Sequence, residues 1–223
     1  MIVSHEHQFI FIHIQRTAGT SIAKSLCGAM KIEEWEGFIG EPRQVALDNQ
    51  KNFEDVYFTD HRKKFEGKKH MTARDIKKVV GKKTWSSYFT FSFTRNPWDR
   101  ILSSYLKRRK EFTRHTEYIW PDSKMLFNAA VLVKFGLMGW KRKAQTDYLT
   151  DESGNIIVDF VGKFENLEDD FRKVCSKVNL DAELCNNKDT TSNSPYSEYY
   201  YDLTKKVVEK HELKSNNPME YEF

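Results

Sequence analysis

The segment Tyr88-Phe-Thr-Phe-Ser-Phe-Thr94 alternates aromatic residues with small hydroxyl residues, and Arg95-Asn-Pro-Trp-Asp-Arg-Ile-Leu-Ser-Ser-Tyr105 follows it directly. An alternation with a period of two predicts a β-strand over residues 88–94. Asn96 and Pro97 are typical of a helix N-cap and of the first helical position. Apolar residues then recur at helical spacing. The stretch therefore predicts a strand, a sharp exit and a helix that extends to about Phe112.

A second unit of the same kind opens the chain. Gln8-Phe-Ile-Phe-Ile-His-Ile14 is a β-rich apolar run that predicts a buried strand, and a helix is expected from Ser21 onward. The turn between them contains Gly19. A turn at a helix N-terminus presents main-chain N–H groups to an anion, and a glycine lets the backbone approach closely. On its own, the turn is equally consistent with an ordinary strand-to-helix connection, and it lacks the G-x-x-x-x-G-K-[ST] pattern of nucleotide triphosphatases.

The remaining sequence predicts a further alternation of elements. Strands are expected at Val56–Thr59 and 158–164, helices at 121–138, 166–178 and 196–213, and a tight turn at Gly154-Asn155. Another helix is expected to begin after Thr72, with Thr72 as N-cap and Asp75 in a capping-box position, and to end at Gly81. Strands that alternate with helices indicate an α/β fold with a mostly parallel sheet covered on both faces. Ligands of such sheets bind at the carboxyl ends of the strands, here after Ile14 and after Thr94.

Length and composition fit one globular domain. The chain has 223 residues, of which 39% are hydrophobic and 14% aromatic. No apolar run approaches the roughly 20 residues of a membrane span, and the first residues do not read as a secretory leader. We therefore expect no membrane partner and a cytoplasmic location. Cys27, Cys175 and Cys185 lack metal-type spacing, so neither a metal site nor a disulfide framework is expected.

Charge is unevenly distributed along the chain, although the formal net charge is only +4. Residues 61–83 hold ten Lys and Arg against two acids, whereas residues 145–202 hold thirteen acids against five bases. Such asymmetry indicates a face that meets an anionic partner, but it is equally typical of a solvated lysine surface. No nucleic-acid-binding motif accompanies the basic stretch, so nucleic acid is not expected as the partner.

Taken together, the two strand ends resemble the PAPS-dependent sulfotransferases, particularly the carbohydrate type (PAPS is 3′-phosphoadenylyl sulfate). The family's 5′-phosphosulfate loop reads like P-K-[TA]-[AG]-G-T-S, where this chain has Gln15-Arg-Thr-Ala-Gly-Thr-Ser21. Its 3′-phosphate motif resembles R-N-P-x-x-R-x-x-S-x-Y, which residues 95–105 match at every specified position. The segments 145–149, 158–167 and 221–223 also look like parts of this family, whereas the likeness is weakest over 31–65 and 112–143. The fold expected is therefore one three-layer, P-loop-like domain over residues 1–223.

The resemblance implies which residues hold the donor PAPS. Residues of the first loop would hold its 5′-phosphosulfate: Arg16, Thr17, Ala18, Gly19, Thr20 and Ser21. Arg95 and Ser103 would hold the 3′-phosphate, which suits a planar guanidinium beside a hydroxyl. The family most often has lysine where Arg16 stands. Arg16 is nevertheless assigned a catalytic part, the stabilisation of the leaving group. No metal is expected in this reaction.

The general base is predicted to be His70. It lies in Lys69-His-Met-Thr-Ala73, which resembles an H-x-T-A segment of carbohydrate members, and its ordinary pKa near 6.5 suits neutral pH. His61 is the reserve candidate, and His13, inside the first strand, is assigned a structural role. Lys188 fits a partly matching Asn-Lys-Ser segment that reaches the nucleotide in the family, but it reads more simply as a solvated loop lysine.

The sequence thus predicts in-line transfer of a sulfuryl group from PAPS to a carbohydrate hydroxyl. The alternatives are a catalytically silent nucleotide- or glycan-binding protein of the same fold, a phosphotransferase and a nucleic-acid-binding protein. The basic stretch favours an anionic polysaccharide as the acceptor. Neither the sugar, the position sulfated nor the oligomeric state follows from the sequence.

Overall fold

The computed structural model describes residues 1–31, 70–116, 123–137, 143–185, 194–213 and 219–223. The chain divides into two compact units. Unit 1 comprises Met1–Thr94 and Asp147–Asn187, and unit 2 comprises Arg95–Thr146 and Lys188–Phe223. The strand expected at 56–59 and the part of the basic stretch at 61–69 lie outside the described residues.

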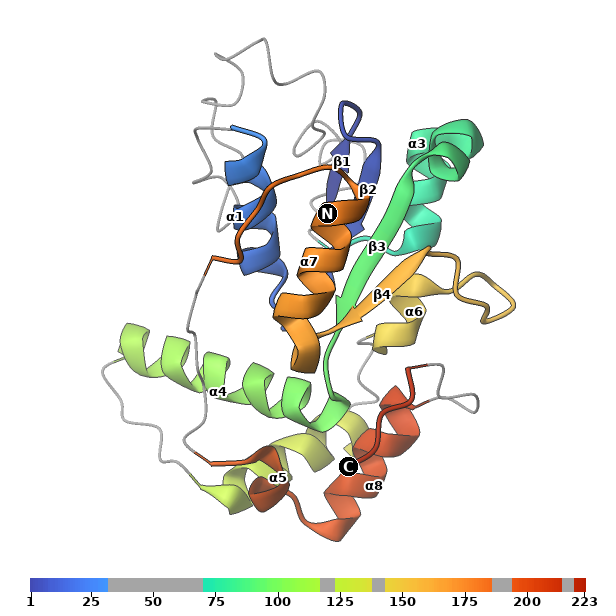
Figure 1. The fold of residues 1–223 in the computed structure, drawn as a ribbon. Coiled ribbons are helices and arrows are strands. Elements are labelled where there is room, and N and C mark those ends of the chain that lie inside the picture. The colour runs from blue at the N-terminus through green and yellow to red at the C-terminus, as the bar shows by residue number, and fades with distance from the viewer. Residues whose placement is uncertain (32–69, 117–122, 138–142, 186–193, 214–218) are drawn as a thin grey trace. The chain divides into compact units, whose positions relative to one another are not determined.

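Unit 1 is built on a four-stranded sheet of β1 (Ile2–Ser4), β2 (Phe9–Ile12), β3 (Phe89–Thr94) and β4 (Phe160–Lys163), in that spatial order (Figure 1). β2, β3 and β4 pair in parallel, whereas β1 pairs antiparallel with β2. The expected α/β class and the strands around residues 9, 89 and 160 are confirmed. β1 was not expected from the sequence.

Period-two alternation gives the sheet an aromatic face and an opposite face on which β2 contributes isoleucines and β3 contributes small hydroxyl residues. The aromatic face packs on α1 (Gly19–Ala29) and α7 (Leu167–Lys177). Its fully buried rings belong to Phe9, Phe11, Phe91 and Phe93. On the opposite face the Ser92 hydroxyl donates to the Ile12 carbonyl at 2.7 Å, so that its burial leaves no lost hydrogen bond. The core of unit 1 therefore lies between the phenylalanine face and α1 with α7.

The other side of the strands carries α3 (Ala73–Ser87), which contacts β3 away from α1 and α7 (Figure 1). Thr72 is its N-cap, as expected, and accepts from the Asp75 N–H at 3.2 Å. Gly81 has φ +83° and ψ 158°, a non-helical conformation that interrupts α3 where the stop was expected. A second helical segment, which was not expected, continues beyond this kink to Ser87 and buries Trp85.

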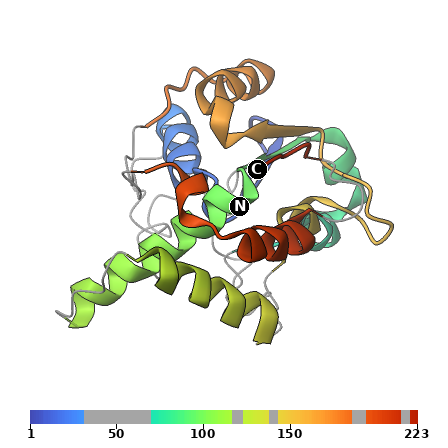
Figure 2. The ribbon, with the colours of Figure 1, turned by 90° about the horizontal axis from the view of Figure 1, so that it is seen from below.

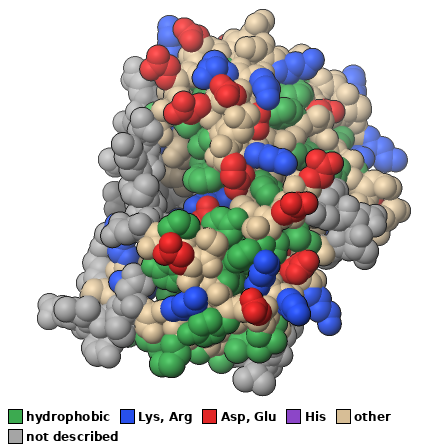
Figure 3. Space-filling model, turned by 60° about the horizontal axis from the view of Figure 1, so that its bottom comes forward, with side chains coloured by type: hydrophobic (Ala, Val, Ile, Leu, Met, Phe, Trp, Pro, Cys, Tyr) green, Lys and Arg blue, Asp and Glu red, His purple; other side chains and the backbone are tan. Residues whose placement is uncertain are grey.

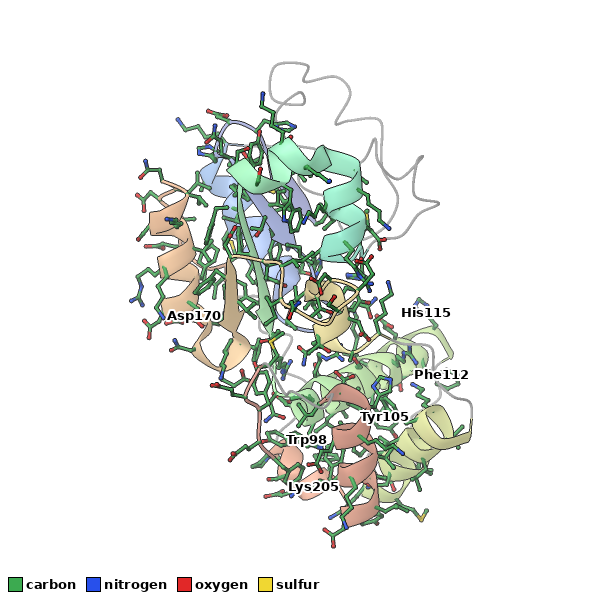
Figure 4. All side chains as sticks on the ribbon, turned by 90° about the vertical axis from the view of Figure 1, so that its right-hand side faces the viewer. Trp98, Tyr105, Phe112, His115, Asp170 and Lys205 are labelled. Atoms are coloured by element: carbon green, nitrogen blue, oxygen red, sulfur yellow. The ribbon has the colours of Figure 1, made fainter. Side chains whose placement is uncertain are left out.

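β4 leads through a 3-10 turn, η4 (Phe164–Asn166), into α7. The Asp170 carboxylate on α7 (Figure 4) accepts from the Lys163 N–H at 2.8 Å and so fastens the helix to the strand end. Upstream, α6 (Gln145–Leu149) precedes the expected turn, where Gly154 has φ +84° and an antiparallel bridge joins Thr150 to Ile156.

Unit 2 is helical. It contains α4 (Pro97–Thr116), α5 (Lys124–Leu132) with the π-turn η3 (Val133–Leu137), the 3-10 turn η5 (Tyr196–Tyr199) and α8 (Asp202–Glu212). α8 lies beside α4 and α5 (Figure 2). One continuous helix over 196–213 was expected; instead the backbone is extended at Tyr200, and the Tyr201 N–H donates to the Asn128 side chain at 3.0 Å.

Candidate functional site

The loop between β2 and α1 has an unusual backbone. Arg16 and Ala18 adopt φ +67° and +60°, a left-handed conformation that side-chain-bearing residues rarely occupy. Strained backbone of this kind is concentrated at ligand-binding sites, where the surrounding structure maintains it. The two left-handed residues turn the chain so that α1 begins at Gly19, two residues before the expected start.

The N-terminus of α1 is arranged to receive an anion. Its N-cap is Ala18, which has no side-chain acceptor, and its first turn contains no acid. The N–H groups of Gly19, Thr20 and Ser21 belong to the first turn, where a helix supplies no carbonyl partners. By contrast, the Asn96 side chain accepts from the Trp98 N–H at 3.1 Å at the start of α4. A phosphate would supply the acceptor that Ala18 cannot.

The predicted phosphate ligands of this loop differ in what they offer. Thr17 is buried, and its hydroxyl donates to the Ile14 carbonyl at 3.0 Å. Its role in anion binding is therefore limited to its main-chain N–H. Arg16, Ala18 and Thr20 are partly exposed, whereas Gly19 and Ser21 are buried.

Gly19 is required by its neighbour. A Cβ placed on Gly19 would lie 2.9 Å from Cγ of His13 and closer still to Cδ2 and Nε2 of the same ring. Carbon atoms that are not bonded cannot approach so closely. The first residue of α1 therefore rests directly against the His13 imidazole, which leaves room only for glycine.

The predicted base His70 also contacts His13. The rings of His13 and His70 meet edge to face, with centroids 4.8 Å apart. Nδ1 of His70 is 2.9 Å from the His13 carbonyl oxygen. A carbonyl only accepts, so Nδ1 carries the proton and, in the neutral ring, Nε2 carries the lone pair. Unit 1 thus brings His70, His13 and the start of α1 together.

Arg95 and Ser103, the predicted 3′-phosphate ligands, are neighbours in unit 2. One terminal nitrogen of the Arg95 guanidinium is 3.3 Å from the Ser103 hydroxyl, and Nε of Arg95 donates to Asp99 at 2.8 Å. Ser103 is buried on α4, and Arg95 is partly buried. A guanidinium fixed along one edge and adjacent to a hydroxyl is suited to bind a phosphate.

Gln145 holds the backbone of Arg95 in place, a role that sequence reasoning missed. Its side-chain oxygen accepts from the Arg95 N–H at 2.9 Å, and its side-chain nitrogen donates to the Arg95 carbonyl at 2.8 Å. The residue had been noted only as part of a segment resembling the family. Its fifty-residue separation from Arg95 gives no local signal of this contact.

Other residues of the 95–105 segment make structural contacts. Asn96 caps α4 and also donates to the Glu222 carbonyl at 2.9 Å. Arg100 donates to both carboxylate oxygens of Glu212 on α8 at 2.7 and 2.6 Å, and both side chains are buried. Nε1 of Trp98 donates to the Lys205 carbonyl at 3.1 Å (Figure 4). The motif therefore combines the two predicted phosphate ligands with residues that build the start of α4.

Two other sequence expectations concern surface and metal chemistry. Within the residues that the structure describes, no three His, Cys, Asp or Glu side chains gather as metal ligands would. On the face drawn in Figure 3, basic and acidic side chains of the described residues are interspersed. His61 and Lys188 lie outside the described residues.

The comparisons with known proteins identify the family. The model of the Sulfotransferase family matches residues 1–222, and the chain belongs to this family. It is thereby placed among the transferases. A protein of Archaeoglobus fulgidus, described as uncharacterized, is 34% identical over 117 residues, which is 51% of this chain and 87% of that protein. No solved structure matches the chain. Among the helices of the described segments, none is both long and apolar enough to cross a membrane.

Proposed function

We propose that this chain transfers a sulfuryl group from PAPS to a hydroxyl of a carbohydrate acceptor by in-line displacement, with His70 as general base. The observation that carries the proposal is the arrangement in unit 1. The predicted base lies one side chain away from the uncapped start of α1, although 50 residues of sequence separate Thr20 from His70. Family membership supplies the reaction class.

In the proposed reaction, Nε2 of His70 removes the proton from the acceptor hydroxyl. The acceptor oxygen forms a bond to sulfur while the bond from sulfur to the bridging phosphate oxygen breaks. The bond's electron pair leaves with the product, adenosine 3′,5′-bisphosphate. The α1 N–H groups and Arg16 would stabilise the negative charge that develops on this leaving group. No step needs a metal.

The same donor carries a 3′-phosphate, for which Arg95 and Ser103 are the proposed ligands. Their proximity at the start of α4 supports this role, since a buried hydroxyl beside a guanidinium offers two donors to one phosphate. Asp99 and Gln145 would orient Arg95, through its side chain and its backbone respectively.

An acidic polysaccharide is the acceptor that the surface of α3 favours. This helix begins three residues after His70 and carries the exposed lysines Lys78, Lys82 and Lys83. Its only acid is Asp75, whose carboxylate accepts from the Thr72 hydroxyl at 2.7 Å. A cationic surface raises the local concentration of an anionic polymer, and the effect weakens with salt.

The test is transfer of radiolabelled sulfate from PAPS to a panel of neutral and acidic polysaccharides. We expect turnover with an acidic member, lost by a factor of roughly 10²–10⁴ in His70→Ala. Transfer that is only a few-fold slower in this variant would contradict the role of His70. The alternative, a silent binding protein, is favoured by one observation, the arginine at position 16. A silent binding protein would bind PAPS without transferring sulfate to any acceptor.

A further inference from the structure

We infer that His13 is a positioning residue, whose imidazole sets the distance and orientation of the base His70 relative to the first turn of α1. The inference rests on the proposed function, because that proposal gives His70 its role. From the sequence, His13 had been assigned a structural role within its strand. Its contacts in unit 1 indicate a more specific one.

The His13 ring is itself held rigidly. His13 comes directly after β2 and is 5% exposed. Its ring stacks on that of Phe11 with centroids 5.9 Å apart and planes inclined by 16°. Phe11 belongs to the aromatic face that packs on α1 and α7. The imidazole is thus fixed to the core of the sheet and provides a rigid surface for its neighbours.

On one side the ring defines where α1 begins. Gly19 approaches the Cδ2 and Nε2 edge so closely that no side chain fits between them. A glycine at position 19 and a ring at position 13 are therefore a matched pair. Since Gly19 follows the left-handed Ala18, this contact also fixes the end of the strained loop.

The ring also limits the orientation of His70. The hydrogen bond from Nδ1 to the His13 carbonyl fixes one atom of the His70 ring. The edge-to-face contact at 4.8 Å and 72° adds a second constraint on the plane of the ring and so on the direction of Nε2. Proton removal requires Nε2 within about 3 Å of the acceptor hydroxyl. A misplacement of about 1 Å can cost 10²-fold in rate.

The activity test is a double-mutant cycle of His13→Ala and His70→Ala. We expect His13→Ala to lower kcat by roughly ten- to one-hundred-fold with little change in donor affinity. In the His70→Ala background the same change is expected to cost clearly less, because the part of its effect that runs through the base is already lost. Equal losses in both backgrounds would overturn the inference. His115→Ala, which removes an exposed imidazole from α4 (Figure 4), is the matched control.

Two further variants guard against simple loss of folding. His13→Phe keeps an aromatic ring between Gly19 and His70, so it is expected to retain most of kcat. A folded His13→Phe as impaired as His13→Ala would contradict a positioning role for the ring. In Gly19→Ala, the added methyl group collides with His13. Adding His13→Ala to that variant is therefore expected to restore thermal stability, and failure to do so would refute the close contact.

A measurement on the protein without substrates separates this inference from the proposed function. Nitrogen-15 shifts of the His70 ring report which nitrogen carries the proton. We expect the Nδ1–H form in both the wild type and His13→Ala, because the main-chain carbonyl remains, but slow solvent exchange of this ring N–H only in the wild type, where the imidazole restrains the ring. Equally slow exchange in His13→Ala would overturn the inference, even in an active enzyme. Conversely, the expected shifts and exchange rates in a chain that transfers no sulfate would leave His13 as the partner of His70 and reject only the sulfotransferase proposal.

Discussion

The His13 imidazole fills the space that a Cβ on Gly19 would occupy. Gly19→Ala is therefore expected to destabilise the protein, even though alanine normally favours a helix. Overpacking of a buried contact typically costs about 1–3 kcal/mol in the free energy of unfolding. Chemical denaturation measures this change.

Gly28 in the same helix is the matched control, because it is exposed and a Cβ there meets no atom within 4 Å. Gly28→Ala should be neutral or should stabilise the protein by about 0.5–1 kcal/mol. If the two alanine variants behaved alike, the contact between Gly19 and His13 would not exist as described.

Arg95 and Ser103 should determine the preference for a 3′-phosphate. Hydrogen bonds to a charged group are worth about 1.5–3 kcal/mol, so Arg95→Ala should weaken binding of adenosine 3′,5′-bisphosphate by roughly 10- to 100-fold. Binding of 5′-AMP should be unchanged, since it lacks the group that Arg95 contacts. Competition binding with both nucleotides measures the ratio.

Arg108→Ala removes an exposed arginine from α4, the helix that carries Ser103. This control should leave the affinities for adenosine 3′,5′-bisphosphate and 5′-AMP unchanged. If Arg95→Ala weakened the binding of both nucleotides equally, the variant would have disrupted the protein generally, and Arg95 would not recognise the 3′-phosphate.

Arg16 is expected to act on the leaving group. Arg16→Ala should reduce kcat by roughly 10²-fold, the usual effect of removing one group that stabilises developing charge. Arg16→Lys should retain activity, because lysine keeps the cation. Position 16 has a positive φ, which costs free energy for any residue other than glycine. Since neither replacement is glycine, this cost is the same in both variants. If turnover is unchanged in both variants, Arg16 has no catalytic part.

The buried pair of Arg100 and Glu212 should make stability depend on pH. Burial alone would raise the pKa of Glu212, but Arg100 and His211 lower it below its ordinary value of 4.5. A carboxylate with a lowered pKa in the folded state stabilises the protein fully above its unfolded pKa. This contribution is then lost as the pH falls through the lower folded value.

Glu212→Gln should therefore reduce the fall in the free energy of unfolding at acid pH. At neutral pH it should cost roughly 3–5 kcal/mol, because it leaves the buried Arg100 without a counter-charge. Glu209→Gln, on the exposed face of the same helix, is the control for a change in net charge. Equal effects of the two variants on this fall at acid pH would show that the buried pair is not its source.

Local sequence signals predicted much of the fold. The apolar run at 9–12 and the alternation at 89–94 each formed strands, and Thr72 and Asn96 capped helices as their side-chain chemistry requires. β1 was missed because three residues carry too short a pattern, and its pairing with β2 is a tertiary contact. Gly81 signalled a stop, but burial of Trp85 stabilises the helical segment beyond it.

The site residues predicted from the sequence all lie in contiguous motifs. These are the loop at 16–21, the Arg95 motif and the short segment that contains His70. Gln145 and His13 act through contacts with residues far away in the sequence, at Arg95 and His70 respectively. Such pairings depend on how the chain folds, and periodicity carries no information about them.

Calorimetric titration with adenosine 3′,5′-bisphosphate, alongside 5′-AMP and Mg-ATP, tests the central claim most directly. A protein that uses PAPS must bind the bisphosphate product, which carries a 3′-phosphate, more tightly than a nucleotide without that group. We predict clear binding of the bisphosphate and much weaker binding of 5′-AMP. Absence of bisphosphate binding, particularly if Mg-ATP binds, would contradict the assignment of this chain as a PAPS-dependent enzyme.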